Sequence, residues 1–195
     1  MVGKSIVLLL VAALAAVGWS KHHDRIEEQD RLAVVASGIV GHKVDVHCPN
    51  LFKKLVSVSG EAGTVKFDEQ GRPASYTDLA PETCDALKGV DEVDLSCLDS
   101  ATCDRKQWKL AWALHTLAHE AFHLRGIRSE AIAECYALQN TAFVAERLGV
   151  PARQAQELQR WVYVKGYPNE PDEYRSDECA DGGTLDLRPE TSRFP

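Results

Sequence analysis

Apolar residues dominate the segment from Trp108 to Leu124, where nearly every other residue is Trp, Leu, Ala or Phe. A helix with this composition is buried on most of its sides, so we expect it to be the central helix of the fold. At about 100° per residue, its polar side chains from position 115 onward fall within roughly 140° of arc. They are His115, Thr116, His119, Glu120 and His123. The helix is therefore predicted to have a single polar stripe.

A second helix is predicted immediately after a short turn. Gly126 suits a helix C-terminus in the left-handed conformation, and Ser129 is a favourable N-cap. Glu130 then opens a helical pattern that stops at Gly149 and Pro151. Two helices joined by so short a turn are expected to run roughly antiparallel.

The N-terminal half shows the alternation of strands. Four short runs have this character: Val44–Cys48, Leu55–Ser59, Gly63–Phe67 and Ala74–Leu79. We expect them to form a small antiparallel sheet. Further helices are predicted at 21–40, 81–87 and 153–165. The predicted fold class is α+β, with the sheet packed on a helical C-terminal half that contains the central helix hairpin.

Residues 1–20 have the pattern of a signal peptide or membrane anchor. Lys4 precedes an apolar run from Ser5 to Trp19, and Ala13-Leu14-Ala15 offers a cleavage site. The run of about fifteen residues is shorter than the roughly twenty that span a bilayer, which favours cleavage. Residues 21–195 are then expected to form one domain outside the cytoplasm. Membrane association is expected only through this N-terminal segment, if it is retained.

The six cysteines all follow that segment: Cys48, Cys84, Cys97, Cys103, Cys135 and Cys179. An even number in an exported chain predicts three disulfides, although fifteen connectivities are possible in principle. We expect Cys97 to pair with Cys103, Cys48 with Cys84, and Cys135 with Cys179, which would tie the tail to the second helix. In that tail, which is rich in Pro, Asp, Glu and Gly, only 184–187 has the pattern of a strand or docking segment.

Length and charge narrow the class of protein. A chain of 195 residues with 45% hydrophobic content can form one domain with a substantial core. The net charge of −7 leaves no basic surface to meet phosphates, which argues against a nucleic acid partner.

The polar stripe carries the motif HExxH. His119 and His123 are four residues apart, so their imidazoles can share a cation, and Glu120 can face a water molecule on that cation. Positions equidistant from the turn face one another, which places Glu130 opposite His123 and Glu134 opposite His119. We therefore predict zinc held by His119, His123 and Glu130, with Glu134 orienting His119 through its other ring nitrogen. The reverse assignment of the two glutamates stays open.

An HExxH motif followed on the next helix by Glu130 and Glu134 resembles the gluzincin metallopeptidases, in which two His and one Glu bind zinc. The resemblance implies His119, His123 and Glu130 as ligands and Glu120 as general base; Glu134 stands where those enzymes usually have Asp. The segment 115–139 is also similar to small exported bacterial proteins with HE-x-x-H-L-R-G-x-x-x-E-A-x-A-E-C, themselves proposed metallopeptidases. A metzincin assignment is rejected, because its third His would fall on Ser129.

The expected function is zinc-dependent hydrolysis of peptide bonds in a peptide or protein substrate, with Glu120 moving the proton of water to the leaving amine. Five residues are candidates by chemistry alone for stabilising the oxyanion: His115, Arg125, Tyr136, Tyr163 and Tyr167. Two alternatives stay open. The chain can be a non-catalytic, zinc-stabilised binding or scaffolding protein, or a metal-free helical hairpin with internally hydrogen-bonded histidines.

Overall fold

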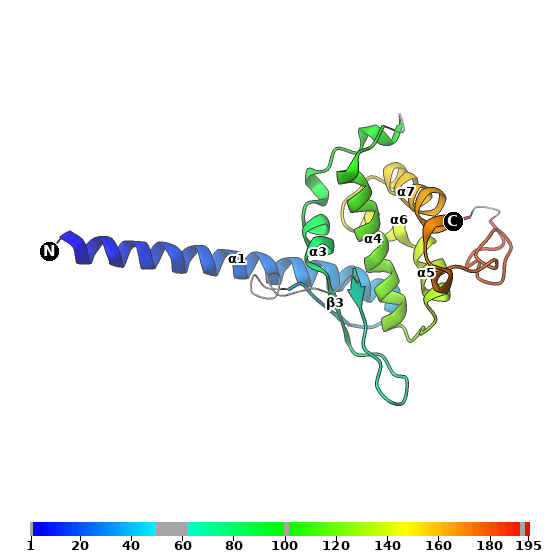
Figure 1. The fold of residues 1–195 in the computed structure, drawn as a ribbon, viewed down its shortest axis with the longest axis horizontal. Helices are drawn as coiled ribbons and strands as arrows, with labels where there is room; N and C mark the ends of the chain where they lie inside the picture. Colours follow the sequence, from blue (N-terminus) through cyan, green and yellow to red (C-terminus); the bar gives the residue numbers. More distant parts are fainter. Residues whose placement is uncertain (1, 50–61, 100–101, 192–193) are drawn as a thin grey trace.

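The computed structural model describes residues 2–49, 62–99, 102–191 and 194–195. They form an α+β fold in which a three-stranded sheet packs beside a group of helices (Figure 1). The longest element is α1 (Val2–Val40), whose N-terminal part projects away from the rest of the molecule. Among the described residues, no helix combines the length and the apolar sequence needed to cross a bilayer.

The C-terminal part of α1 anchors this helix to the body of the protein. Its buried side chains follow the helical pattern i, i+3, i+4 and i+8 and so form one stripe: Leu32, Val35, Ala36 and Val40. Gly41, with a φ of +87°, ends the helix in the left-handed conformation. The helix predicted at 21–40 is confirmed, and the segment predicted as signal or anchor runs into it without a break.

The sheet has the order β1-β3-β2 and consists of β1 (Asp45–His47), β2 (Gly63–Thr64) and β3 (Tyr76–Leu79). β2 pairs antiparallel with β3, as expected, but β1 pairs parallel with β3, so the sheet is mixed. A parallel pair needs a long connection, and the chain between β1 and β3 supplies one. Alternation predicts where a strand lies but not its direction. The strand predicted at 55–59 lies outside the described residues.

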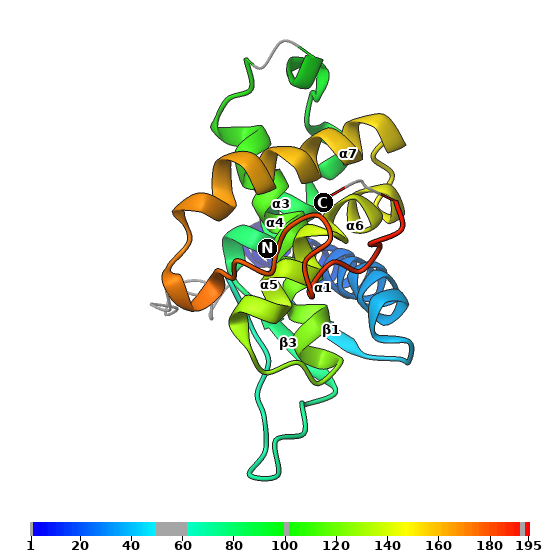
Figure 2. The same ribbon diagram turned by 90° about the vertical axis from the view of Figure 1, so that its right-hand side faces the viewer.

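Helix α4 (Arg105–Leu124) is the central helix, as predicted. Asp104 caps it, its side chain accepting from the Lys106 amide while the Gln107 side chain accepts from the Asp104 amide. Every residue of α4 from Ala113 to Leu124 is buried. Its neighbours, which include the sheet, are α1, α3 (Pro81–Lys88), α5 (Glu130–Leu138), α6 (Thr141–Arg147) and α7 (Ala152–Trp161) (Figure 2).

The second predicted helix is divided into α5 and α6 at Gln139 and Asn140. Both side chains bond to backbone carbonyls one turn back: Gln139 Nε2 to Cys135 O at 3.1 Å, and Asn140 Nδ2 to Tyr136 O at 2.8 Å. Such local bonds compete with helix continuation and favour a break. The helix predicted at 153–165 also ends early, at Trp161, where a π-helical turn (Val162–Gly166) follows.

Three disulfides join the expected pairs, Cys48–Cys84, Cys97–Cys103 and Cys135–Cys179. Complete pairing of the cysteines is typical of proteins in oxidising, extracytoplasmic environments. The tail segment predicted as a strand or docking segment forms no strand, but it does dock: Gln139 bonds to Leu185 O at 2.8 Å and accepts from the Leu187 amide at 2.7 Å.

Candidate metal centre

The hairpin of α4 and α5 is closed by a tight turn. The Gly126 amide donates to His123 O at 2.9 Å and the Ile127 amide to Phe122 O at 3.1 Å, with Gly126 at a φ of +102°. Ser129 Oγ then accepts from the Ile132 amide and caps α5. The turn is therefore built as predicted, and it fixes the distance between the last turn of α4 and the first turn of α5.

Three donor atoms converge across this hairpin. His119 Nε2 lies 2.8 Å from His123 Nε2, and Glu130 Oε2 lies 3.1 Å and 3.2 Å from these two nitrogens, respectively. In a tetrahedral site with ligand bonds of about 2.1 Å, donor atoms are about 3.4 Å apart. The observed distances of 2.8, 3.1 and 3.2 Å are all shorter than this, the one between the two nitrogens by the most, and a small outward movement of the side chains would let the three residues hold one metal ion.

The other ring nitrogens indicate which atoms are free to bind. His123 Nδ1 lies 2.7 Å from Ile127 O, and His119 Nδ1 lies 3.0 Å from Glu134 Oε2. Carbonyl and carboxylate oxygens only accept, so each Nδ1 donates, and in the neutral imidazole each Nε2 then carries a lone pair. Two lone pairs and a carboxylate facing one another repel unless a cation lies between them. The donor set therefore fits a metal.

A proton can take the place of that cation. Burial lowers the pKa of His119, but hydrogen bonds to the Glu130 and Glu134 carboxylates outweigh this effect and raise the pKa to about 9. Because a metal ligand must be the neutral imidazole, metal binding is expected to release this proton.

Glu134 lies behind the donor set. Its Oε2 accepts from His119 Nδ1 and lies 2.9 Å from His115 Nε2, while His115 Nδ1 lies 3.2 Å from Thr141 Oγ1. Burial raises the pKa of Glu134, but the charges and hydrogen bonds of His115 and His119 lower it to about 2. Its side chain is 3% exposed, against 37% for Glu130. Glu130 is thus the glutamate that faces both Nε2 atoms, and Glu134 is the one that orients His119.

His115, His119 and Glu134 form a second group that could hold a metal ion. In that group His119 would bind through Nδ1, the atom that already bonds to Glu134. The side chains of His115 and Glu134 are 2% and 3% exposed, which leaves little room for a water molecule or substrate. We therefore interpret His115 and Glu134 as residues that hold the His119 ring in place for the first group.

Glu120 lies on the same polar stripe, against the edge of the sheet. Thr77 Oγ1 bonds to Thr64 O at 3.0 Å and lies 3.4 Å from Glu120 Oε2. A Cβ atom at Gly63 would lie 2.7 Å from Glu120 Cγ and 2.8 Å from its Oε1. The absence of a side chain at Gly63 therefore lets β2 approach the glutamate. This close contact fixes the Glu120 carboxylate beside the donor set.

A cavity of about 570 Å³ opens over these groups. Its lining comes from four parts of the chain: Ala62–Val65 and Phe67 beside β2; Trp112, His115, Thr116, His119, Glu120 and His123 of α4; Arg128, Glu130 and Glu134 of the turn and α5; and Glu170, Pro171 and Tyr174 of the C-terminal segment. The predicted ligands and general base thus share one open site.

Tyr174 is a site residue that the sequence patterns missed. Its ring centroid lies 5.8 Å from that of His119, and burial, followed by the Glu130, Glu120, Glu134 and Glu170 charges, raises its pKa to about 12. Of the five predicted oxyanion candidates only His115 lines the cavity, and it is engaged by Glu134 and Thr141. The C-terminal segment that contains Tyr174 has no helical or strand periodicity, so the sequence did not indicate that this residue lies at the site.

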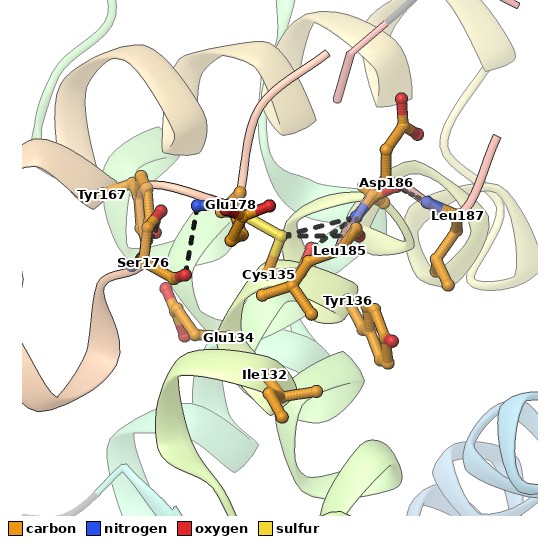
Figure 3. Close-up of a disulfide and its surroundings, with 12 residues drawn as sticks. Ile132, Glu134, Cys135, Tyr136, Tyr167, Ser176, Glu178, Leu185, Asp186 and Leu187 are labelled. Atoms are coloured by element: carbon orange, nitrogen blue, oxygen red, sulfur yellow. Dashed lines mark hydrogen bonds between the residues drawn. A yellow bond between two sulfur atoms is a disulfide. The ribbon is translucent and has the colours of Figure 1, made fainter. Parts of the chain in front are cut away.

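The segment that brings Tyr174 to the cavity is held at its base. The Tyr167 hydroxyl accepts from the Ser176 amide at 2.8 Å and donates to Ser176 O at 3.2 Å. Three residues later, Cys179 is bonded to Cys135, next to Glu134 (Figure 3). The loop between Tyr167 and Ser176 is therefore closed on itself and tied to the helix that carries two of the acidic site residues.

No family model, curated protein or solved structure matches this chain. A function for this chain is therefore inferred from the geometry of the site. Two imidazole nitrogens and a carboxylate can bind a divalent metal, a neighbouring carboxylate can take up a proton, and a phenol can donate a hydrogen bond, all within one cavity.

Replacing Glu134 with Gln is expected to weaken metal binding by about 10- to 100-fold, because the neutral amide holds the His119 ring less firmly and makes its Nε2 a weaker donor. Competition with a chromogenic chelator measures the affinity. Glu146→Gln, the same change at an exposed position of α6, is the matched control and should bind metal as the unmodified protein does. Equal affinities for Glu134→Gln and the control would remove Glu134 from its orienting role.

Proposed function

We propose that this chain is a zinc-dependent metallopeptidase that acts outside the cytoplasm. The observation that supports it most is the convergence of His119 Nε2, His123 Nε2 and Glu130 Oε2 at the wall of an open cavity, with Glu120 alongside. A structural zinc site has four protein ligands and is closed, whereas a catalytic site has three and an open fourth position. The described donor set has three protein ligands beside an open cavity, as in a catalytic site.

Zinc is the proposed metal because two neutral imidazoles and one carboxylate are a ligand set that this ion uses in hydrolytic enzymes. When bound, zinc lowers the pKa of a water molecule toward about 7 and polarises the carbonyl group of the substrate.

Glu120 is the proposed general base. The residue is 4% exposed, and its carboxylate lies against the sheet at Gly63 and Thr77, in the same cavity as the donor set. From there it can accept the proton of the attacking water and deliver it to the leaving amine nitrogen. His119 and His123 would bind the metal through Nε2, because the Nδ1 atom of each is engaged by an acceptor oxygen. Tyr174 Oη is the proposed donor to the oxyanion, since its raised pKa keeps the phenol protonated at neutral pH.

Tyr174→Phe is expected to lower kcat by about 10²- to 10³-fold with little change in KM, because the lost hydrogen bond acts on the charge that develops in the transition state. Steady-state kinetics on a peptide substrate measure both constants. Tyr163→Phe, a change outside the cavity lining, is the control. A kcat for Tyr174→Phe within about twofold of the control would assign oxyanion stabilisation to another group.

The experiment for the proposed function is cleavage of an unfolded protein by the purified chain. Activity should disappear with a chelator, return with one equivalent of zinc, and increase with zinc up to that stoichiometry. Zinc that binds and raises the Tm without any cleavage of a diverse peptide library would instead support the non-catalytic scaffolding function. The open cavity favours the enzyme, because a scaffold has no need of space beside its metal.

The location of this activity is part of the proposal. We assign residues 1–20 as an export signal that is cleaved, with retention as a membrane anchor as the alternative. The three disulfides support an oxidising compartment. N-terminal sequencing of the exported protein distinguishes a cleaved signal from a retained anchor.

A further inference from the structure

The cavity wall carries a carboxylate that the proposed reaction does not use. Glu170 lines the cavity, as Trp112 and His115 do, and is half-buried. Within the part of the chain that the structure describes, its side chain makes no hydrogen bond or ion pair. A half-buried carboxylate without a partner is unfavourable, so a ligand that supplies one would be stabilised there.

The cavity makes the charged form of Glu170 costly. Burial, followed by the Glu134 charge, raises the pKa of Glu170, against the lowering effect of His115 and His119. A cationic group bound next to this carboxylate would favour its charged form and offset that cost.

Trp112, which lines the same cavity, has a fixed position. Trp112 packs edge-on against His115, with ring centroids 5.2 Å apart, and it also contacts Trp108 at 5.7 Å. A Cβ atom at Gly166 would lie 2.7 Å from Trp112 Cζ2, so only glycine lets the chain pass over this ring on its way to Glu170. Indole rings and carboxylates both bind ammonium and guanidinium groups, and the lining of this cavity contains one of each in Trp112 and Glu170.

The lining also contains a basic residue. Arg128 lies over the Phe67 ring, 5.8 Å from its centroid, and both residues line the cavity. A cationic group of a bound peptide would be repelled by Arg128 and attracted by Glu170.

We infer that Glu170 and Trp112 form a specificity subsite that selects peptides carrying an ammonium or guanidinium group next to the scissile bond. The inference rests on the proposed peptidase function and names its substrate class. The loop that carries Glu170 is closed by the Tyr167–Ser176 hydrogen bonds, so the carboxylate is positioned before the substrate arrives.

The test uses the zinc-loaded full chain and short peptides, acetylated and amidated at their ends, that differ only in having Lys, Arg or Met at one position. The kcat/KM values for Lys and Arg should exceed that for Met by about tenfold, the effect of one half-buried charge-assisted contact. In Glu170→Gln this ratio should fall to about one. The matched control is Glu173→Gln, an exposed position on the same segment outside the cavity lining, which should keep the ratio. A ratio that is unchanged in Glu170→Gln would overturn the inference.

A binding measurement separates this inference from the peptidase function itself. Calorimetry on the zinc-loaded Glu120→Gln variant should show tighter binding of the Lys peptide than of the Met peptide, and the double variant with Glu170→Gln should lose this difference. A preference in binding without any turnover in the unmodified protein would reject the peptidase and keep the subsite. Equal binding of both peptides would reject the subsite. Peptides with a free N-terminus show whether the selected ammonium belongs to a side chain or to the chain end.

Discussion

Glu120→Gln is expected to lower kcat by about 10²- to 10⁴-fold while the metal stays bound, because the amide cannot accept the proton of the attacking water. The substitution keeps the size of the side chain and so preserves its packing against Gly63 and its contact with Thr77. Cleavage of a fluorogenic peptide measures the loss, and elemental analysis of the same sample measures the zinc. The two readings together separate a catalytic defect from a structural one.

The matched control is Glu146→Gln, at an exposed position on α6. It should have normal kcat and normal zinc content. Peptidase activity that survives in Glu120→Gln at the level of this control would remove Glu120 from the role of general base. Loss of zinc together with activity would assign Glu120 to metal binding instead.

His123→Ala is expected to weaken metal binding strongly and to abolish activity. If each of three ligands supplies about a third of the 10–16 kcal/mol typical of a zinc site, its loss weakens binding by about 10²- to 10⁴-fold. The metal-free variant should fold, because His123 is not part of the hydrophobic core and the three disulfides are unchanged. Differential scanning calorimetry with and without zinc should therefore show a zinc-dependent rise in Tm in the unmodified protein but not in the variant.

His42→Ala, at an exposed position before the sheet, is the control and should keep the zinc-dependent rise in Tm. If His123→Ala retained the full rise, zinc would be bound elsewhere. The buried group of His115, His119 and Glu134 would then be the first place to look.

The positions of the proposed ligands could be predicted because they depend on local rules. Helical periodicity puts His119, Glu120 and His123 on one stripe, and a glycine turn followed by a serine N-cap fixes the length of the hairpin. Counting from that turn brings Glu130 and Glu134 opposite the histidines. The structure has these side chains at the expected places, with Glu130 toward Nε2 and Glu134 toward Nδ1 of His119.

The other wall of the site could not be predicted, because it depends on long-range contacts. Glu170 and Tyr174 lie in a segment without periodicity, and their position is set by the Tyr167–Ser176 hydrogen bonds and by the disulfide of Cys179. The parallel pairing of β1 and β3 is another long-range feature, since alternation of burial is the same in both strand directions. The same holds for the approach of Gly63 to Glu120, which the sequence shows only as a glycine in a strand.

The most direct test of the proposed metal centre is a crystal structure of the zinc-loaded protein with anomalous data at the zinc edge. We expect one ion, about 2.0–2.2 Å from His119 Nε2, His123 Nε2 and a Glu130 carboxylate oxygen, with its fourth position open to the cavity. An ion bound by other residues, an ion with a fourth protein ligand, or no ion at this hairpin would contradict it.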